Sequence, residues 1–111
     1  MTSPTPLFRW DGPYWGFVAA GSLFDRYGRH AGWLEGADAY HRTGRFMGEL
    51  RDGQYVVRDL LRAQPIPRAP RPAVPYAAPP APLATRDARE PIADWADALP
   101  WPLPPPEPPR V

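Results

Sequence analysis

The sequence predicts an all-β fold made of four β-hairpin repeats of sixteen residues, followed by a proline-rich and largely extended tail. Two observations predict it. One sequence motif recurs at a spacing of sixteen residues between positions 7 and 53, and each copy has aromatic, glycine and aliphatic residues at the same motif positions, here called columns. Sixteen of the 19 prolines follow Gln64, so the last part of the chain has a different composition and forms no core of its own.

Each copy of the motif has the sequence signals of a β-hairpin. The columns hold an aromatic residue (Phe8, Phe24, Tyr40), a first glycine (Gly12, Gly28, Gly44), a second glycine (Gly16, Gly32, Gly48) and an aliphatic residue (Val18, Leu34, Leu50). In the second copy, 22–25 is a short strand, the turn ends at Gly28, and 29–34 is the returning strand. On the first returning strand, positions 14, 16 and 18 share one face.

The second glycines and the fourth copy need separate explanations. Glycine weakens a strand unless another group must come close, so we expect these glycines to admit the aromatic ring of a neighbouring hairpin. In the fourth copy Val56 falls in the aromatic column and Leu60 replaces the turn glycine. A degenerate last copy is typical of a terminal, capping repeat.

These signals divide the chain into a lead-in at 1–6, a repeat domain at 7–62 and a proline-rich tail at 63–111. The tail favours polyproline II, interrupted by one short helix predicted at 91–99. Pro91 suits a first helical position, and Ile92, Trp95 and Leu99 follow at spacings of three and four. Pro100 then ends the helix.

The repeated motif consists of an aromatic residue, then Asp-x-x-Gly-Arg, then apolar-Gly-apolar. It resembles the motif of the 4-fold beta flower domain, a small bacterial family. The resemblance covers roughly Leu7 to Leu61 and implies hairpins with pseudo-fourfold symmetry, but no activity. The sequence departs from the pattern at Pro13, where other copies have Arg29 and Arg45, and in the fourth turn. Residues 40–45 also resemble PRC-barrel and YD-repeat sequences, so a PRC-barrel-like small β-barrel is the alternative fold.

Composition excludes several function classes. Thirteen positive residues against 12 negative ones give a net charge of +1, without the basic excess that a nucleic-acid partner requires. The absence of cysteine excludes disulfides and thiolate zinc sites. No leader and no membrane span is recognised, so the expected location is the cytoplasm.

Arginines at the turns suggest one binding site. Arg26, Arg29, Arg42 and Arg45 could ring one end of the assembly and hold an anion, or could be solvated turn residues. His30 and His41 lack a recurring acidic partner, so neither a metal site nor a cofactor is predicted. Without a nucleophile-base order or a phosphate-binding loop, we do not expect an enzyme.

The tail carries the favoured functional hypothesis, a non-enzymatic protein-interaction or scaffold module. An apolar cluster among prolines should dock on a partner or back onto the domain, and the last prolines fit an SH3-ligand pattern or a stiff spacer. The residues concerned are Ile92, Trp95, Leu99, Trp101, Pro105, Pro108 and Arg110. The alternatives are a small-ligand domain for an anion or carbohydrate, and a self-associating structural subunit that forms homo-oligomers.

Overall fold

A computed structural model of the protein describes residues 4–72, 74–75 and 77–99. These residues form strands and no helix, so the all-β prediction is confirmed. The strands are β1 (Thr5–Phe8), β2 (Tyr14–Ala19), β3 (Ser22–Asp25), β4 (His30–Glu35), β5 (Asp38–His41), β6 (Phe46–Arg51), β7 (Tyr55–Asp59) and β8 (Trp95–Asp97).

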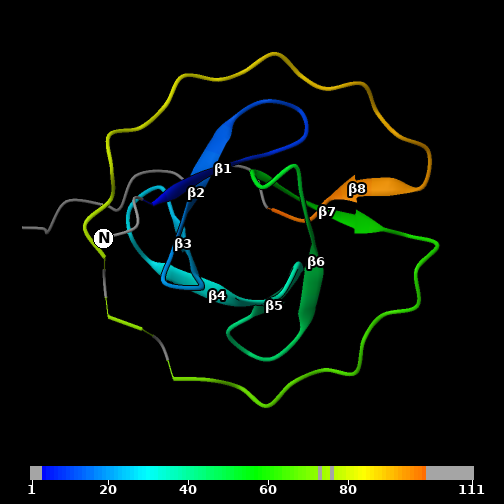
Figure 1. The fold of residues 1–111 in the computed structure, drawn as a ribbon, viewed down its shortest axis with the longest axis horizontal. Coiled ribbons are helices and arrows are strands. Elements are labelled where there is room, and N and C mark those ends of the chain that lie inside the picture. Colours follow the sequence, from blue (N-terminus) through cyan, green and yellow to red (C-terminus); the bar gives the residue numbers. More distant parts are fainter. Residues whose placement is uncertain (1–3, 73, 76, 100–111) are drawn as a thin grey trace, which may run out of the picture.

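The first seven strands close into a small β-barrel (Figure 1). Successive strands pair antiparallel from β1 to β7, and β1 returns to pair with β7 in parallel through Phe8 and Tyr55. The eighth strand adds to β7 by antiparallel pairing. The small β-barrel expected as the alternative fold is therefore the observed architecture.

A β-bulge in the first hairpin changes which residues of β2 share a face, so the predicted simple alternation is wrong at this point. Phe8 pairs with Tyr14 while Leu7 pairs with Gly16, so Trp15 is an extra residue. Because a bulge inserts one residue, the alternation of faces is reset there. Trp15 lies in the core cluster with Leu7, whereas Tyr14 packs against Phe8 in a separate cluster. The same shift occurs after Leu23 and after Ala39.

The barrel has two apolar layers. Aliphatic residues and one tryptophan fill the main core cluster: Leu7, Trp15, Leu23, Ala39, Val56 and Leu99. Aromatic rings form the second layer in pairs, with Phe17 stacked on Phe24 at 5.2 Å and Trp33 stacked on Tyr40 at 5.8 Å between centroids.

The last hairpin is shifted by one residue relative to the others. Phe17 pairs with Phe24, but at the corresponding place Glu49 pairs with Val57. The cause is the connection after β6, which has three residues (52–54), whereas the connections after β2 and β4 have two (20–21 and 36–37). The prediction that Val56 takes the aromatic column is wrong, because Val57 takes that position and Val56 enters the core.

The second glycines admit backbone rather than rings. A Cβ added at Gly16 would overlap the carbonyl oxygen of Phe24, and one at Gly32 would overlap that of Tyr40. A Cβ at Gly48 would likewise overlap the carbonyl oxygen of Val57, so the expected close approach is present at all three glycines, but the group that approaches is the backbone of the neighbouring strand. Any side chain here would separate β2 from β3, or β4 from β5.

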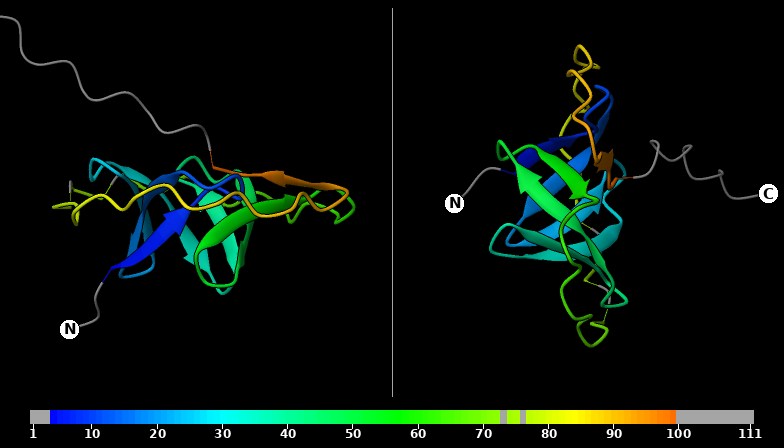
Figure 2. Two further views of the ribbon diagram at one scale, coloured as in Figure 1. Left: turned by 90° about the horizontal axis from the view of Figure 1, so that it is seen from above. Right: turned by 90° about the vertical axis from the view of Figure 1, so that its right-hand side faces the viewer.

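The described residues between 61 and 94, here called the belt, pass around the outside of the barrel and return to β7 (Figure 1). Figure 2 shows this ring edge-on, as one turn of chain about the middle of the barrel. The described residues from 63 to 92 form neither helix nor strand. The described part of the tail thus packs along the barrel.

Backbone hydrogen bonds attach the belt to the barrel's turns. The N–H groups of Arg68, Ala77 and Arg86 donate to the carbonyls of Gly44, Gly28 and Gly12 at 2.8, 3.1 and 3.0 Å. The donors are nine residues apart and the acceptors are sixteen residues apart. Nine residues of the belt therefore span the distance from one barrel turn to the next. All three glycines have positive φ, at 95°, 86° and 116° in that order.

Arginine side chains of the belt cover the outer aromatic layer. The guanidinium carbon lies 3.8 Å from the ring centroid of Phe8 for Arg86, and 4.1 Å from that of Trp33 for Arg71. Such cation–π contacts each contribute roughly 0.5–1 kcal/mol at exposed sites. The belt therefore explains how rings on the outer wall of a barrel are buried.

The helix predicted at 91–99 is not formed. Asp94 has φ of 65° and precedes the short strand β8, which pairs with the free edge of β7. In a helix Ile92, Trp95 and Leu99 would share a face. In the extended chain they separate: Ile92 is 41% exposed, Trp95 packs on Trp10, and Leu99 is 1% exposed in the core.

Candidate functional site

A pocket of about 250 Å³ lies where the belt returns to the barrel. It is formed by the first turn, the end of the belt, and β7 and β8. Its lining is mainly apolar, and we call it the aromatic pocket: Trp10, Asp11, Val57, Ala88, Arg89, Pro91, Ile92, Trp95, Ala96 and Asp97.

Two tryptophans define the aromatic pocket and are held by neighbours. The Trp10 and Trp95 rings meet edge to face at 5.6 Å, and Trp10 meets Tyr55 in the same way at 5.3 Å. The indole N–H of Trp10 donates to the carbonyl of Glu90 at 2.8 Å. Because their ring contacts, and the hydrogen bond of Trp10, are already made, the two rings are preorganised to contact a ligand through their remaining surface.

The charged groups around the aromatic pocket are paired with groups of opposite charge. Arg9 bonds Asp11 at 2.9 Å and lies 3.5 Å from Asp97, so its positive charge offsets part of the negative charge of the two carboxylates. Arg89 lies over Trp10 at 4.4 Å and forms an ion pair with Asp52. The pocket thus favours an apolar group over a charged one.

The fourth turn, beside the pocket, presents apolar side chains to solvent. Leu60 is 58% exposed and Leu61 is 77% exposed. Leu60 reaches the pocket's border through its backbone bond to Asp94, the residue before Trp95. Exposed apolar groups that adjoin a pocket commonly mark an interaction surface.

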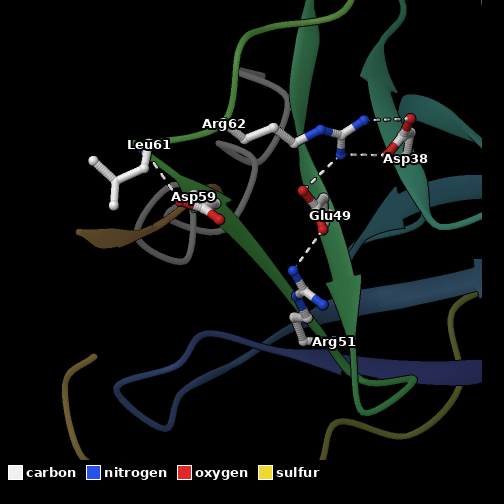
Figure 3. Close-up of polar contacts among 6 residues, drawn as sticks. All are labelled: Asp38, Glu49, Arg51, Asp59, Leu61 and Arg62. Carbon is white, nitrogen blue, oxygen red and sulfur yellow. Dashed lines mark hydrogen bonds and ion pairs between the residues drawn. The ribbon is translucent and has the colours of Figure 1, made fainter. Parts of the chain in front are cut away.

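An ion-pair cluster fixes this turn. Arg62 bonds Asp38 at 2.9 Å and Glu49 at 2.6 Å, and Glu49 also pairs with Arg51 at 2.7 Å (Figure 3). These carboxylates raise the pKa of Arg62 above its ordinary value. Figure 3 shows the Leu61 side chain directed away from the cluster. The turn is therefore anchored by Arg62 while Leu61 stays available.

The predicted ring of four turn arginines is not formed. Arg29 bonds Asp25 at 2.7 Å, and Arg26 lies 5.6 Å from the ring centroid of Tyr14. The side chains of Arg42 and Arg45 have no hydrogen bond or ion pair within the described part of the chain, and Arg45 lines a cavity that Arg42 does not line. Two of the four arginines thus serve local contacts, and the four do not line one site.

The cavity that Arg45 lines has a volume of about 500 Å³, and we call it the basic cavity. It is lined by Arg9, His41, Arg45, Phe46, Met47, Arg58, Asp97, Ala98 and Leu99. Arg58 was missed because the sequence aligns it with the turn arginines Arg26 and Arg42. It lies instead within β7, opposite Ala96 of β8.

The two histidines have local partners. His30 Nδ1 accepts the Val74 N–H at 3.2 Å, and burial lowers the pKa of His30. His41 Nδ1 lies 2.9 Å from the Thr43 hydroxyl. Burial, then the positive charges of Arg45 and Arg42, lower the pKa of His41. Across the described ranges, no three His, Asp or Glu residues are grouped to hold a metal ion.

The partner-binding residues predicted in the tail are separated by the structure. Ile92 and Trp95 line the aromatic pocket, whereas Leu99 lies in the core and also lines the basic cavity. The other four predicted residues, Trp101, Pro105, Pro108 and Arg110, lie outside the described residues. Trp10 was missed as a site residue by the sequence analysis, because its contact with Trp95 depends on the path of the belt.

Comparison of the chain with protein-family models, with curated proteins and with solved structures finds no match. The resemblance to the 4-fold beta flower domain therefore stays a prediction. Within the described residues, no helix is long and apolar enough to cross a membrane.

Proposed function

We propose that the chain is a non-enzymatic protein-interaction module whose binding surface is the aromatic pocket with the adjoining Leu60 and Leu61. The observation that carries the proposal is the pair of fixed tryptophans, Trp10 and Trp95, lining an open apolar pocket. Tryptophans in such settings supply most of the binding energy at protein interfaces, and neighbouring apolar groups exclude water around them.

The proposed occupant is an extended, proline-containing segment of a partner protein. A pocket of about 250 Å³ holds one or two side chains and is smaller than most cofactor sites. Aromatic-lined grooves bind proline-rich segments because these are already extended and lose little entropy. Pro91 of the belt forms part of this pocket's wall, so proline is compatible with the surface.

The proposal includes a pseudo-fourfold arrangement of the barrel, as the sixteen-residue repeat predicts. Bulges after Leu7, Leu23 and Ala39 support it because they recur at equivalent positions. The belt bonds to the turn glycines support it in the same way. In this arrangement the fourth turn differs from the other three, because Leu60 replaces the turn glycine. The proposed binding surface adjoins this fourth turn.

The experiment compares two exposed isoleucines. The full chain is titrated with a panel of proline-rich peptides while the indole N–H signals of Trp10 and Trp95 are followed by NMR. Ile92→Asp should abolish the response, because Ile92 lines the pocket. Ile66→Asp is the control, because Ile66 is 79% exposed and does not line the pocket.

Two results would count against the proposal. Equal binding by both variants would place the peptide elsewhere on the molecule. Light scattering that shows the chain associating with itself, lost in Ile92→Asp, would favour the self-associating structural subunit.

A further inference from the structure

The basic cavity holds two arginines, Arg45 and Arg58, whose charges no carboxylate of the described chain pairs with. Arg9, Arg45 and Arg58 line it, against a single carboxylate, Asp97, which lies 3.5 Å from Arg9. Arg9 also donates to the carbonyl of Leu99. In the described part of the chain, the guanidinium groups of Arg45 and Arg58 have no hydrogen bond or ion pair.

Several arginines elsewhere in the described chain have a carboxylate partner. Examples are Arg29 with Asp25, Arg68 with Glu35, and Arg62 with Asp38 and Glu49. Arg58 is half-buried, so its charge has lost part of its hydration without gaining a counter-charge. An anion between Arg45 and Arg58 would supply that counter-charge and form charge-assisted hydrogen bonds.

Apart from His41, the remaining residues that line the basic cavity are apolar. Phe46 and Met47 come from β6, and Ala98 and Leu99 follow β8. A fully hydrated inorganic ion would leave these side chains without contacts, whereas an apolar body attached to the anionic group would cover them. A volume of about 500 Å³ is in the range of sites for small organic molecules.

We propose that the basic cavity binds a small organic anion, a carboxylate or phosphate monoester with an apolar body, through Arg45 and Arg58. This site is separate from the aromatic pocket and does not depend on the peptide-binding function. Asp97 is the one residue that lines both, and its pairing with Arg9 limits its repulsion of the anion.

His41 provides an internal reporter of the bound anion. The charged and titratable groups around it are Arg45, Arg42 and His30, with Arg9, Arg58 and Asp97 across the cavity. Burial and the neighbouring positive charges lower the pKa of His41. A bound anion places negative charge beside the ring, so the pKa of His41 should rise on binding.

The test measures binding of phenyl phosphate and of benzoate to the full chain by calorimetry, with benzyl alcohol as the uncharged probe and inorganic phosphate as the anion without an apolar body. At least one of the two organic anions should bind, and more tightly than either control. Arg45→Gln and Arg58→Gln should each weaken binding about tenfold or more, since each removes a charge-assisted contact.

Arg42→Gln is the matched control. Arg42 is an exposed neighbour of the same turn that does not line the cavity, so its loss should change affinity by no more than about twofold. Binding that survives both Arg45→Gln and Arg58→Gln would overturn the proposal. So would equal weakening by Arg42→Gln, equal binding of benzyl alcohol, or absence of binding by both organic anions.

NMR titration of His41 adds a readout that a folding defect would not mimic. In the unsubstituted chain the His41 pKa should rise when the tighter probe saturates the site. Arg58→Gln should remove that rise at the same probe concentration while the other chemical shifts stay those of the folded protein. An unchanged His41 pKa in the saturated protein would also overturn the proposal.

Discussion

The backbone N–H of Leu60 donates a 2.7 Å hydrogen bond to the carbonyl of Asp94, so the belt ends where it began. Leu60 follows the last barrel strand and Asp94 precedes β8. This bond closes a ring of chain around the barrel, and β8 then extends the contact along β7. The proposed peptide-binding surface therefore exists only when the ring is closed.

The turn glycines should be sensitive to substitution because of the belt. A Cβ at Gly44 would overlap the carbonyl of Arg68, whereas one at Gly36 would have no heavy atom within 4 Å. Both glycines have positive φ, at 95° and 62°. Gly36→Ala should cost about 1 kcal/mol from backbone strain alone, and Gly44→Ala about 2 kcal/mol or more. Urea unfolding measures both, and equal losses would show that the belt does not press on this turn.

Leu99 should contribute to stability as a core residue does. It belongs to the core cluster with Leu7 and Val56. Leu99→Ala should lower the free energy of unfolding by about 2–5 kcal/mol, because it leaves a cavity. Ile92→Ala, at an exposed position, should cost less than about 0.5 kcal/mol. A small effect of Leu99→Ala in thermal unfolding would mean that the chain end is not packed in the barrel in solution.

Arg86 should couple to Phe8 through their cation–π contact. The distance between the guanidinium carbon and the ring centroid is 3.8 Å. A double-mutant cycle with Arg86→Met and Phe8→Leu should give a coupling free energy of about 1 kcal/mol. The backbone bond from Arg86 to Gly12 remains in both variants, so the cycle isolates the side chains. Additive effects within error would assign the attachment of the belt to backbone bonds alone.

Stability should fall as the pH drops below about 6.5, the ordinary histidine pKa. The pKa values of His30 and His41 are lowered in the folded protein, chiefly by burial. As the pH falls, the two histidines therefore take up protons in the unfolded chain at a higher pH than in the folded protein. The free energy of unfolding is largest above the unfolded pKa and decreases as the pH falls toward the pKa values of the folded protein. His30 must also stay neutral at Nδ1 to accept the Val74 N–H.

Melting temperatures between about pH 7.5 and pH 5 measure this loss. His30→Gln should flatten part of the decline, since it removes one of the two titrating groups. A variant whose melting temperature falls as steeply as that of the unsubstituted chain would exclude His30 as a contributor.

The sequence was sufficient for the class of fold and for the turns. The sixteen-residue period indicates strands, and Gly12, Gly28 and Gly44 do have the positive φ expected at turns. The bulge was not predictable because its extra residue is Trp15, Ala31 or Met47, which share no side-chain type. The register of β7 depended on the length of one connection, which a fixed period does not reveal.

The candidate sites were less predictable because they depend on the belt. Proline content indicates an extended chain but not its path, and the anchoring positions Arg68, Ala77 and Arg86 act through backbone N–H groups that any residue except proline has. Ile92 and Trp95 both line the aromatic pocket, but they come together in extended chain and not on the helical face that their spacing predicts. Arg45 and Arg58 come from different hairpins, and nothing in their spacing indicates a shared cavity.

The belt meets the turns in the reverse of their order in the chain, pairing Arg68 with Gly44, Ala77 with Gly28 and Arg86 with Gly12. These pairs are nested: the segment between Gly44 and Arg68 lies within the segment between Gly28 and Ala77, which in turn lies within the segment between Gly12 and Arg86. Once the innermost pair forms, each later pair closes only a short additional loop and loses little chain entropy. The tail can therefore zip onto the barrel one turn at a time, although its last contacts join residues far apart in the sequence.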